Sequence, residues 1–380
     1  MKNNIKLKGA KILFLCSTDN MIWQFLIPHV KDLIEIGADV DCVCSKTGFW
    51  FDELKDKFGF NMIELKMKRK PLNLTNCRAY NSLKKLQKQN NYSLIFCQQP
   101  TGGMLGRLLG KKFHLPVIYT AHGFFFFKGN SGLKNFIFRS AEKYMSKYTD
   151  ILITMNDEDY DATKNWKMGK SYKIHGIGLD LSKYEETPFN LDALKSELGI
   201  KNGEKIILSV SEFIKRKNYP TMLKTIAALT KTRSDFKYII CGTGAKLDEM
   251  KVLAKKLNIA DKVLFLGYRK DIDRITQIAD IFYHQSFHEG LTMSIMEAMH
   301  FSLPIVASNV RGNYDLVDET GGFLTAPKDI KAQILALNTL LDDEKLRKNM
   351  GKNNHEKVKD YYLDNVRNEM IKIYSDNNLI

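Results

Sequence analysis

Two glutamates flank a predicted helix start in the last third of the chain: Glu289 lies in the loop before it, and Glu297 follows eight residues later. Gly290 allows a tight turn ahead of the helix. The amides of Leu291 and Thr292 would open the helix, and the unpaired N–H groups of a helix start bind anions. A carboxylate can accept hydrogen bonds from two neighbouring hydroxyls, as in a ribose. The segment could therefore bind a phosphate and a sugar. The alternative is that the helix dipole alone favours Glu289 near the helix start and that Glu297 is an ordinary surface residue.

A run of three basic residues, Lys215, Arg216 and Lys217, follows the predicted strand 205–211 and precedes a helix that begins near Asn218. Cations beside a helix N-terminus, at the carboxyl end of a parallel strand, form a suitable site for a diphosphate. Taken alone, this loop has a simpler explanation as a solvated basic segment.

Five consecutive strands of the second half are each followed by a polar, glycine-containing or basic loop. Arg269 and Lys270 follow the strand 262–267, where they could contact a base or a phosphate, and Asp271 is placed to cap the next helix. Because such loops meet at one edge of a parallel sheet, their convergence indicates a binding site better than any single motif does. The five segments are 212–220, 241–244, 267–272, 285–290 and 309–315.

In the first half, His122 and Gly123 follow the predicted strand 116–120. A histidine in this position is a candidate site residue, and a structural histidine is an equal alternative. Four phenylalanines come next, at 124–127. We expect some of them in the core, while an exposed remainder could contact a lipid or an acceptor.

A predicted helix over residues 133–148 carries apolar side chains on one side and basic residues on the other. Such a helix can lie on an anionic membrane surface. It can equally pack its apolar side against the core and leave its basic side in solvent. The apolar positions are 133, 136, 137, 141, 144, 145 and 148, and the basic residues are Lys134, Arg139, Lys143 and Lys147.

Positive charge is concentrated in the first half of the chain. The formal net charge is +15, and residues 1–185 hold 29 of the 58 basic residues but only 17 of the 43 acidic ones. Residues 65–141 contain no Asp or Glu. This one-sided charge predicts an anionic partner, such as a phosphate compound, a nucleic acid or a membrane, with a solvated basic surface as the alternative. No recognised nucleic-acid-binding module accompanies it, so we expect no nucleic-acid partner.

Short apolar strands alternate with amphipathic helices along almost the whole chain, which predicts an α/β protein. A length of 380 residues favours two domains. We expect two doubly wound, Rossmann-like parallel sheets that face each other across a cleft, in domains 1–185 and 186–360. The stretch 178–203, with Pro188, would connect them, and a final helix over 361–380 would pack back towards the N-terminal domain. The predicted strands are 11–16, 39–44, 60–65, 92–97, 116–120, 150–155, 171–174, 205–211, 237–241, 262–267, 280–284 and 303–308.

The composition predicts a cytoplasmic protein without a metal site. No stretch approaches the ~18–20 continuous apolar residues that cross a bilayer. Five of the six cysteines lie in predicted buried strands, and none belongs to a set with zinc spacing. The Asp-x-Asp pairs have no His or Glu that would complete a Mg²⁺ site. We therefore expect reduced cysteines and no metal.

Together these segments resemble the retaining glycosyltransferases of family four, which have the GT-B fold, and the resemblance covers nearly the whole chain. Glu289 and Glu297 match the Glu-x7-Glu motif of the family, and Lys217 matches the lysine that binds the donor diphosphate. The segment TAHGFFFFKG is similar to a loop whose histidine, here His122, faces the donor sugar. The most similar subgroup builds capsule and exopolysaccharide repeat units in bacteria.

The resemblance implies a role for each candidate residue. Glu297 would hold the ribose hydroxyls, and Glu289 would contact the donor sugar near the reacting carbon. Lys217, with Arg216, would stabilise the departing diphosphate, and His122 would complete the catalytic set. The remaining implied contacts are the backbone amides of Gly290, Leu291 and Thr292 with phosphate or sugar, and those of Tyr268, Arg269 and Lys270 with the base.

The chain departs from the family pattern in two loops. Many members have Gly-Arg where this chain has Ser211 and Glu212, so either Arg216 takes the place of that arginine or Lys217 acts with less help. The loop after the first strand, residues 18–20, reads Thr-Asp-Asn where the family often has Gly-Gly.

The resemblance implies metal-independent transfer, with retention, of a hexose or N-acetylhexosamine from a UDP-sugar to a saccharide on a polyprenyl diphosphate. The UDP-sugar is a substrate, and no cofactor is expected. Domain 186–360 would bind this donor, while domain 1–185 would meet the acceptor at the cytoplasmic face of the anionic inner membrane. The runner-up is a UDP-sugar 2-epimerase of the same fold, for which no convincing acid and base carboxylates are found. A basic nucleic-acid-binding protein comes third.

Overall fold

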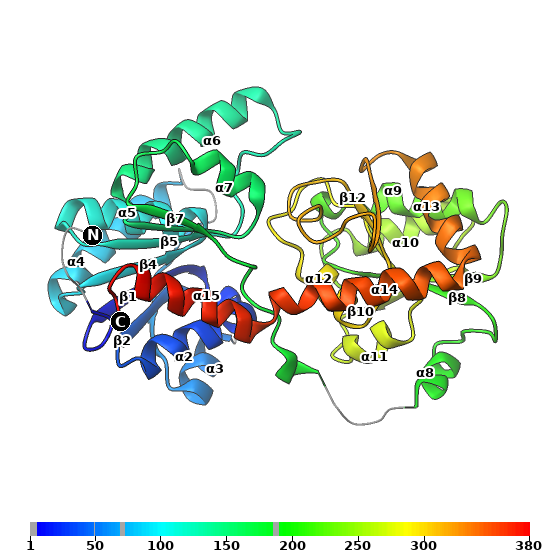
Figure 1. Cartoon of the computed structure of the whole chain (residues 1–380), viewed down its shortest axis with the longest axis horizontal. Helices are drawn as coiled ribbons and strands as arrows, with labels where there is room; N and C mark the ends of the chain where they lie inside the picture. The colour runs from blue at the N-terminus through cyan, green and yellow to red at the C-terminus, as the bar shows by residue number, and fades with distance from the viewer. Residues whose placement is uncertain (1–5, 49, 69–72, 185–189) are drawn as a thin grey trace. The chain divides into compact units, whose positions relative to one another are not determined.

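The chain forms two compact units, which are described separately (Figure 1). The first consists of Met1–Gly178 and Asp364–Ile380, and the second of Leu179–Leu363. The predicted boundary between residues 185 and 186 falls, with Pro188, outside the described residues. The computed structural model describes residues 6–48, 50–68, 73–184 and 190–380.

The first unit is built on a seven-stranded parallel sheet in the order β3-β2-β1-β4-β5-β6-β7. The strand order reverses between β1 and β4, and open α/β sheets bind ligands beside such a switch point. The inner strands β1, β4, β5 and β6 are almost wholly buried, which is why they read as continuous apolar runs. The strands are β1 Lys11–Thr18, β2 Asp39–Ser45, β3 Asn61–Glu64, β4 Leu94–Gln98, β5 Val117–Ala121, β6 Ile151–Thr154 and β7 Lys170–Lys173.

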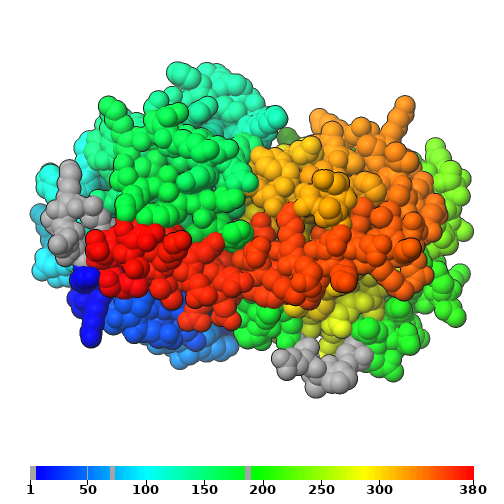
Figure 2. All heavy atoms as spheres, viewed as in Figure 1, coloured from blue at the N-terminus to red at the C-terminus, as the bar shows by residue number. Residues whose placement is uncertain are grey.

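The last helix, α15 (Leu363–Asp376), completes the first unit (Figure 2, red). The Arg367 guanidinium binds the carboxylate of Asp32 on α2. The amide of Leu7 donates to the carbonyl of Leu379 at 2.7 Å, so the two ends of the described chain are joined. The other helices of this unit are α1 Asp19–Met21, the π-helical η1 Ile22–Leu26, α2 Ile27–Glu35, α3 Trp50–Phe58, α4 Leu74–Asn90, α5 Gln99–Phe113, α6 Gly132–Met145, η2 Ser146–Tyr148 and α7 Asp157–Thr163.

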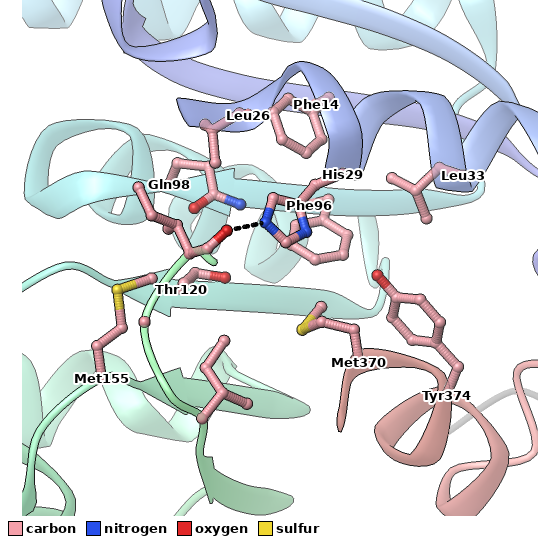
Figure 3. Close-up of a pocket in the computed structure, with 13 residues that line it drawn as sticks. Phe14, Leu26, His29, Leu33, Phe96, Gln98, Thr120, Met155, Met370 and Tyr374 are labelled. Carbon is pink, nitrogen blue, oxygen red and sulfur yellow. Dashed lines mark hydrogen bonds between the residues drawn. The ribbon is translucent and has the colours of Figure 1, made fainter. Parts of the chain in front are cut away.

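A cavity of about 20 Å³ lies between this sheet and α15 (Figure 3). Met370 and Tyr374 of α15 line one side, and His29, Gln98 and Thr120 line the other. A space of this size holds about one water molecule and cannot hold a substrate.

The second unit has a six-stranded parallel sheet in the order β10-β9-β8-β11-β12-β13. All twelve predicted strands of the chain are present within a few residues, but β13 was not predicted. Its four residues, GFLT, begin with the second of two adjacent glycines and end before a proline-containing turn, so the apolar run is too short to recognise. The strands are β8 Lys205–Val210, β9 Phe236–Cys241, β10 Val263–Gly267, β11 Ile281–His284, β12 Ile305–Ser308 and β13 Gly322–Thr325.

Helices cover both faces of the second sheet. Alternate residues of β8 show this, because Ile207 belongs to one core cluster while Ile206 and Leu208 belong to another. Within the described ranges, no helix of either unit is long and apolar enough to cross a membrane. The helices of the second unit are η3 Leu181–Lys183, α8 Leu191–Glu197, η4 Lys215–Lys217, α9 Tyr219–Leu229, α10 Leu247–Lys256, α11 Ile272–Gln277, α12 Met293–His300, α13 Ile330–Asp342, α14 Glu344–Val358 and η5 Lys359–Tyr361.

Strand β13 depends on a glycine that has no room for a side chain. A methyl group added to Gly322 would lie 2.0 Å from the carbonyl oxygen of Ile305 on β12. Because that oxygen belongs to the backbone, no side-chain movement can relieve the clash. We expect Gly322→Ala to lower the free energy of unfolding by about 1–3 kcal/mol in urea denaturation. Gly132→Ala is the control, since nothing lies within 4 Å there, and an equal loss in both variants would contradict the explanation.

Candidate functional site

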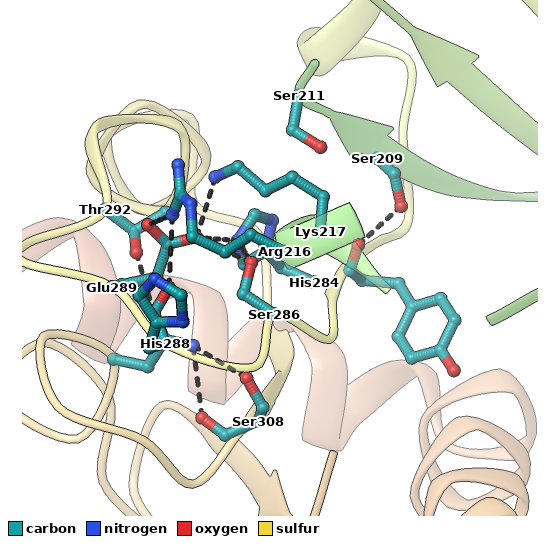
Figure 4. A network of polar contacts seen from close by, with 12 residues as sticks. Ser209, Ser211, Arg216, Lys217, His284, Ser286, His288, Glu289, Thr292 and Ser308 are labelled. Atoms are coloured by element: carbon teal, nitrogen blue, oxygen red, sulfur yellow. Dashed lines mark hydrogen bonds and ion pairs between the residues drawn. The ribbon is translucent and has the colours of Figure 1, made fainter. Parts of the chain in front are cut away.

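The loop after β11 brings the Glu289 carboxylate against the basic loop after β8 (Figure 4). The Lys217 ammonium lies 2.7 Å from Oε1, and the Arg216 guanidinium binds Oε2. The Ser286 hydroxyl donates to Oε1 at 2.5 Å, and Nε2 of His284 lies 3.1 Å from the same atom. Glu289 is only 6% exposed, so these four partners replace nearly all of its hydration.

Strand order explains why these loops meet. β8 and β11 are neighbours in a parallel sheet, so the loops at their carboxyl ends lie side by side. The loop after β12 joins them, because Nε of Arg311 donates to the carbonyl of Glu289 at 2.9 Å. At Gly312 the backbone has φ +81°, and a Cβ would lie 2.5 Å from the carbonyl oxygen of Gly290. Three of the five predicted loops therefore form one cluster.

The cluster carries more positive than negative charge. Burial alone would raise the pKa of the Glu289 carboxyl, but Lys217, the hydrogen bond from His284 and Arg216 together hold it well below its usual range. Burial lowers the pKa of Lys217, and Glu289 opposes this shift. Burial, with nearby cations, lowers the pKa of His284 and of His288 to about 4 each, so both rings are neutral at pH 7. Two cations on one carboxylate leave positive charge available to an anionic ligand.

Glu297 lies on α12 and has different neighbours. It is half-buried, and burial raises its pKa to about 7, against the opposing effects of Lys183 and a hydrogen bond with Tyr184. A carboxylate with so high a pKa is poorly solvated when ionised, and additional hydrogen-bond donors stabilise that form. Glu297 is therefore suited to accept hydrogen bonds from the hydroxyl groups of a ligand.

Helix α12 begins one turn after Glu289. Its N-cap is Thr292, whose side chain does not cap the helix but donates to Oδ1 of Asn313 at 2.7 Å. The residues Gly290, Leu291 and Thr292 thus lead into a helix start without a side-chain cap, as an anion site requires.

The loop after β10 ends at Asp271, which is the N-cap residue of α11 as predicted. Its side chain makes no capping hydrogen bond. Both carboxylate oxygens instead accept from Arg269, at 2.8 and 2.6 Å. Tyr268 is 69% exposed, Lys270 is also exposed, and neither contacts the Glu289 cluster in the hydrogen bonds of the described residues.

The two departures from the family pattern can now be located. Glu212 is exposed, and the hydroxyl of Ser211 lies 2.8 Å from that of Tyr219. Arg216, by contrast, shares the Glu289 carboxylate with Lys217. In the loop after β1, the Asp19 carboxylate is buried and accepts from the Thr47 amide at 3.1 Å.

His122 belongs to the first unit and follows β5. Its Nε2 lies 2.7 Å from Oε1 of Gln98, at the end of β4. Burial, with a smaller effect from His29, lowers the pKa of His122 to about 3, so the ring is neutral. Because an amide oxygen only accepts, Nε2 carries the proton and Nδ1 is the acceptor. Gln98 was not among the predicted site residues, although its place at the end of the neighbouring strand could have indicated it.

The phenylalanine run after His122 divides as predicted. Phe124 and Phe126 are buried in the core of the first unit, whereas Phe125 is 40% exposed. The amide of Phe124 donates to Oδ2 of the buried Asp159 at 3.1 Å, which fixes the start of the run.

Comparison with known proteins gives consistent matches over both units. The family described as Glycosyl transferase 4-like matches residues 11–156, and Glycosyl transferases group 1 matches residues 191–357. The putative glycosyltransferase EpsD of Bacillus subtilis is 29% identical over 373 residues, covering 96% of each chain. The UDP-Gal:alpha-D-GlcNAc-diphosphoundecaprenol alpha-1,3-galactosyltransferase of Escherichia coli is 27% identical, covering 87% of this chain and 90% of its own.

The fold has solved counterparts. Anabaena HepE, solved in complex with UDP, aligns with a TM-score of 0.79 and 17% identity, covering 96% of this chain and 100% of its own. Two parallel α/β units with these matches define a glycosyltransferase with the GT-B fold. Within that class the chain belongs to glycosyltransferase family four, as its sequence resemblance predicted.

The contact between His122 and Gln98 predicts a fixed, neutral ring. We expect the His122 signal in ¹⁵N NMR to keep the Nε2–H tautomer and not to titrate between pH 5 and 8. In Gln98→Glu, the added carboxylate should raise the pKa of His122 into that range. A wild-type ring that titrates near the usual value of about 6.5 would show that Gln98 does not hold this tautomer.

The raised pKa of Glu297 predicts a cost to stability. The carboxyl titrates near 4.3 in the unfolded chain and at about 7 in the fold, so wild type loses stability relative to Glu297→Gln as pH rises through this window. We expect urea denaturation to find Glu297→Gln more stable than wild type at pH 8, with a smaller difference at pH 5. Glu319→Gln, at an exposed position of the same unit, is the control. A wild type that is the more stable at pH 8 would contradict this.

Proposed function

We propose that the protein transfers a hexose or N-acetylhexosamine from a UDP-sugar to a saccharide carried on a polyprenyl diphosphate. The observation that carries the proposal is the pair of cations, Lys217 and Arg216, on the buried carboxylate of Glu289. The Escherichia coli relative, named for a diphosphoundecaprenol acceptor, supports this class of acceptor. The UDP complex of Anabaena HepE supports the nucleotide.

The two cations can stabilise the leaving group. As the bond between the sugar and the phosphate oxygen breaks, negative charge collects on the diphosphate. Lys217 and Arg216 would neutralise it in a largely buried site, where charges interact more strongly than in water. Arg216 would thus take the role of the arginine that many family members have at the position of Glu212. Two side-chain cations would do this without a metal ion.

Binding of the donor would change the partners of Glu289. In the structure its carboxylate binds both cations. A diphosphate would draw Lys217 and Arg216 towards its own oxygens. Glu289 would then accept a hydrogen bond from the donor sugar near the reacting carbon.

The other predicted contacts would complete the donor site. Glu297 would accept hydrogen bonds from the ribose hydroxyls. The amides of Gly290, Leu291 and Thr292 would bind phosphate or sugar. The exposed ring of Tyr268 would contact the base, beside Lys270 and Arg269. His122, neutral with Nδ1 as acceptor, would bind a sugar hydroxyl and would not act as a general acid. We propose retention of the anomeric configuration on the ground of family membership.

A lipid-linked acceptor implies that the transfer takes place at a membrane surface. We infer that the first unit contacts the anionic inner membrane from the cytoplasmic side, because residues 65–141 lack acidic side chains. The epimerase alternative is not favoured, since the relatives named above are transferases. We expect no nucleic-acid partner.

Loss of either cation should slow transfer. We expect Lys217→Ala and Arg216→Ala to reduce transfer of radiolabelled sugar to a polyprenyl-diphosphate saccharide by about 100-fold or more. Lys215→Ala is the matched control, because this neighbouring lysine is exposed. Full activity in both site variants would refute the assignment of the leaving-group site.

The same assay tests the finer parts of the proposal. Activity should survive EDTA, and the product should keep the anomeric configuration of the donor in ¹H NMR. An inverted product or a requirement for a divalent metal would refute these two points separately. Conversion of UDP-N-acetylglucosamine to its 2-epimer without an acceptor would instead establish the alternative enzyme class.

A further inference from the structure

Helix α6 turns its apolar side to solvent. Leu133 is 70% exposed, Phe136 71%, Ile137 51% and Tyr144 50%. Residues at these spacings lie on one side of an α-helix. The sequence left open whether this side packs against the core, and the structure excludes that alternative. Four large apolar side chains on one helix are an extended patch rather than a scatter of single residues.

The opposite side of α6 is the one that packs on the first unit. Met145 is buried, and Phe138 packs against the core cluster. The Asn135 amide donates to the carbonyl of Phe127 at 2.9 Å. At about 100° per residue, these positions lie roughly opposite Leu133. The side of α6 that faces the core is therefore already packed. A small rotation of the helix would not bury the exposed patch.

A buried ion pair holds α6 in this orientation. The Arg107 guanidinium is 2% exposed, lies 2.8 Å from the Glu142 carboxylate and stacks 4.3 Å from the ring centre of Tyr119. Glu142 is the one acidic residue in the sequence of α6, and its charge is directed inward. The outer side of the helix therefore carries no acidic side chain.

Basic and aromatic residues border the apolar patch. Lys111 lies 4.6 Å from the ring centre of Tyr148, and Lys147 lies 5.2 Å from that of Tyr144. Tyrosine and lysine side chains together are typical of the boundary between water and lipid, where the ring is half-immersed and the ammonium reaches the headgroups. The exposed basic residues of α6 itself are Lys134, Arg139 and Lys143.

We propose that α6 docks the protein on an anionic bilayer, with Leu133, Phe136, Ile137 and Tyr144 in the boundary between headgroups and acyl chains. An apolar side bordered by basic residues complements both parts of such a surface. A symmetric contact between two copies fits less well, because it would bring the same basic residues together. The inference deepens the membrane contact of the proposed function but does not depend on the transfer reaction.

The test is co-sedimentation of the full chain with vesicles of phosphatidylcholine alone or with added phosphatidylglycerol. We expect binding to the anionic vesicles, weaker binding to the neutral ones, and a decrease with salt. The double variant Leu133→Ser/Phe136→Ser should lower the partition coefficient about tenfold or more. The control, Val252→Ser/Leu335→Ser, alters side chains of the second unit that are 52% and 69% exposed, and should bind as wild type does.

Three results would overturn the proposal. The first is a wild-type chain that does not bind anionic vesicles, and the second is a double variant that binds them as well as wild type does. The third is a dimer in lipid-free sedimentation velocity that the double variant abolishes, which would make this side a contact between copies. Transfer to a short-chain, water-soluble acceptor separates docking from chemistry. The double variant should retain it, and an inactive wild type that still binds vesicles would refute the proposed function alone.

Discussion

The buried carboxylate of Glu289 is the constraint around which the second unit is organised. A buried charge is tolerated only when its partners replace the lost hydration, and removal of one partner of a buried pair typically costs about 3–5 kcal/mol. Lys217, Arg216 and Arg311 therefore fix the loops after β8, β11 and β12 relative to one another. The same pairing keeps two cations in place before any ligand arrives. Stability of the loops and readiness for an anion thus have one physical cause.

The two units use positive charge differently. In the second unit it is local and largely buried, with each cation held by a hydrogen bond in a fixed position, which suits recognition of one small anion. In the first unit it is spread along a stretch of sequence without acids, and α6 combines exposed basic residues with an exposed apolar side. Diffuse charge attracts an extended anionic surface and falls off with salt. These two arrangements suit the proposed soluble donor and the proposed membrane-bound acceptor.

The sequence predicted the parts of the fold that repeat a simple pattern. Strands such as β1 and β8 are buried on both faces and read as apolar runs, whereas β13 is too short to stand out between its flanking glycines and proline. Periodicity could not orient α6, because Phe138 and Met145 on the inner side are as apolar as Leu133 and Phe136 on the outer side. Spacing along the chain likewise could not pair Gln98 with His122, or Asp271 with Arg269. Such contacts depend on strand order and side-chain geometry.

The return of α15 to the first unit has a consequence for the order of synthesis. Residues 364–380 are made after the whole second unit, yet Met370, Tyr374 and Leu379 are buried in the first. On the ribosome, the second unit can close once Leu363 has emerged, while the earlier one still exposes the side of α2 that Arg367 will cover. The unit begun first is therefore finished last. Until α15 is made, the first unit exposes the apolar surface that this helix will cover. A chaperone could bind there, or a non-native contact could form there, before the chain is complete.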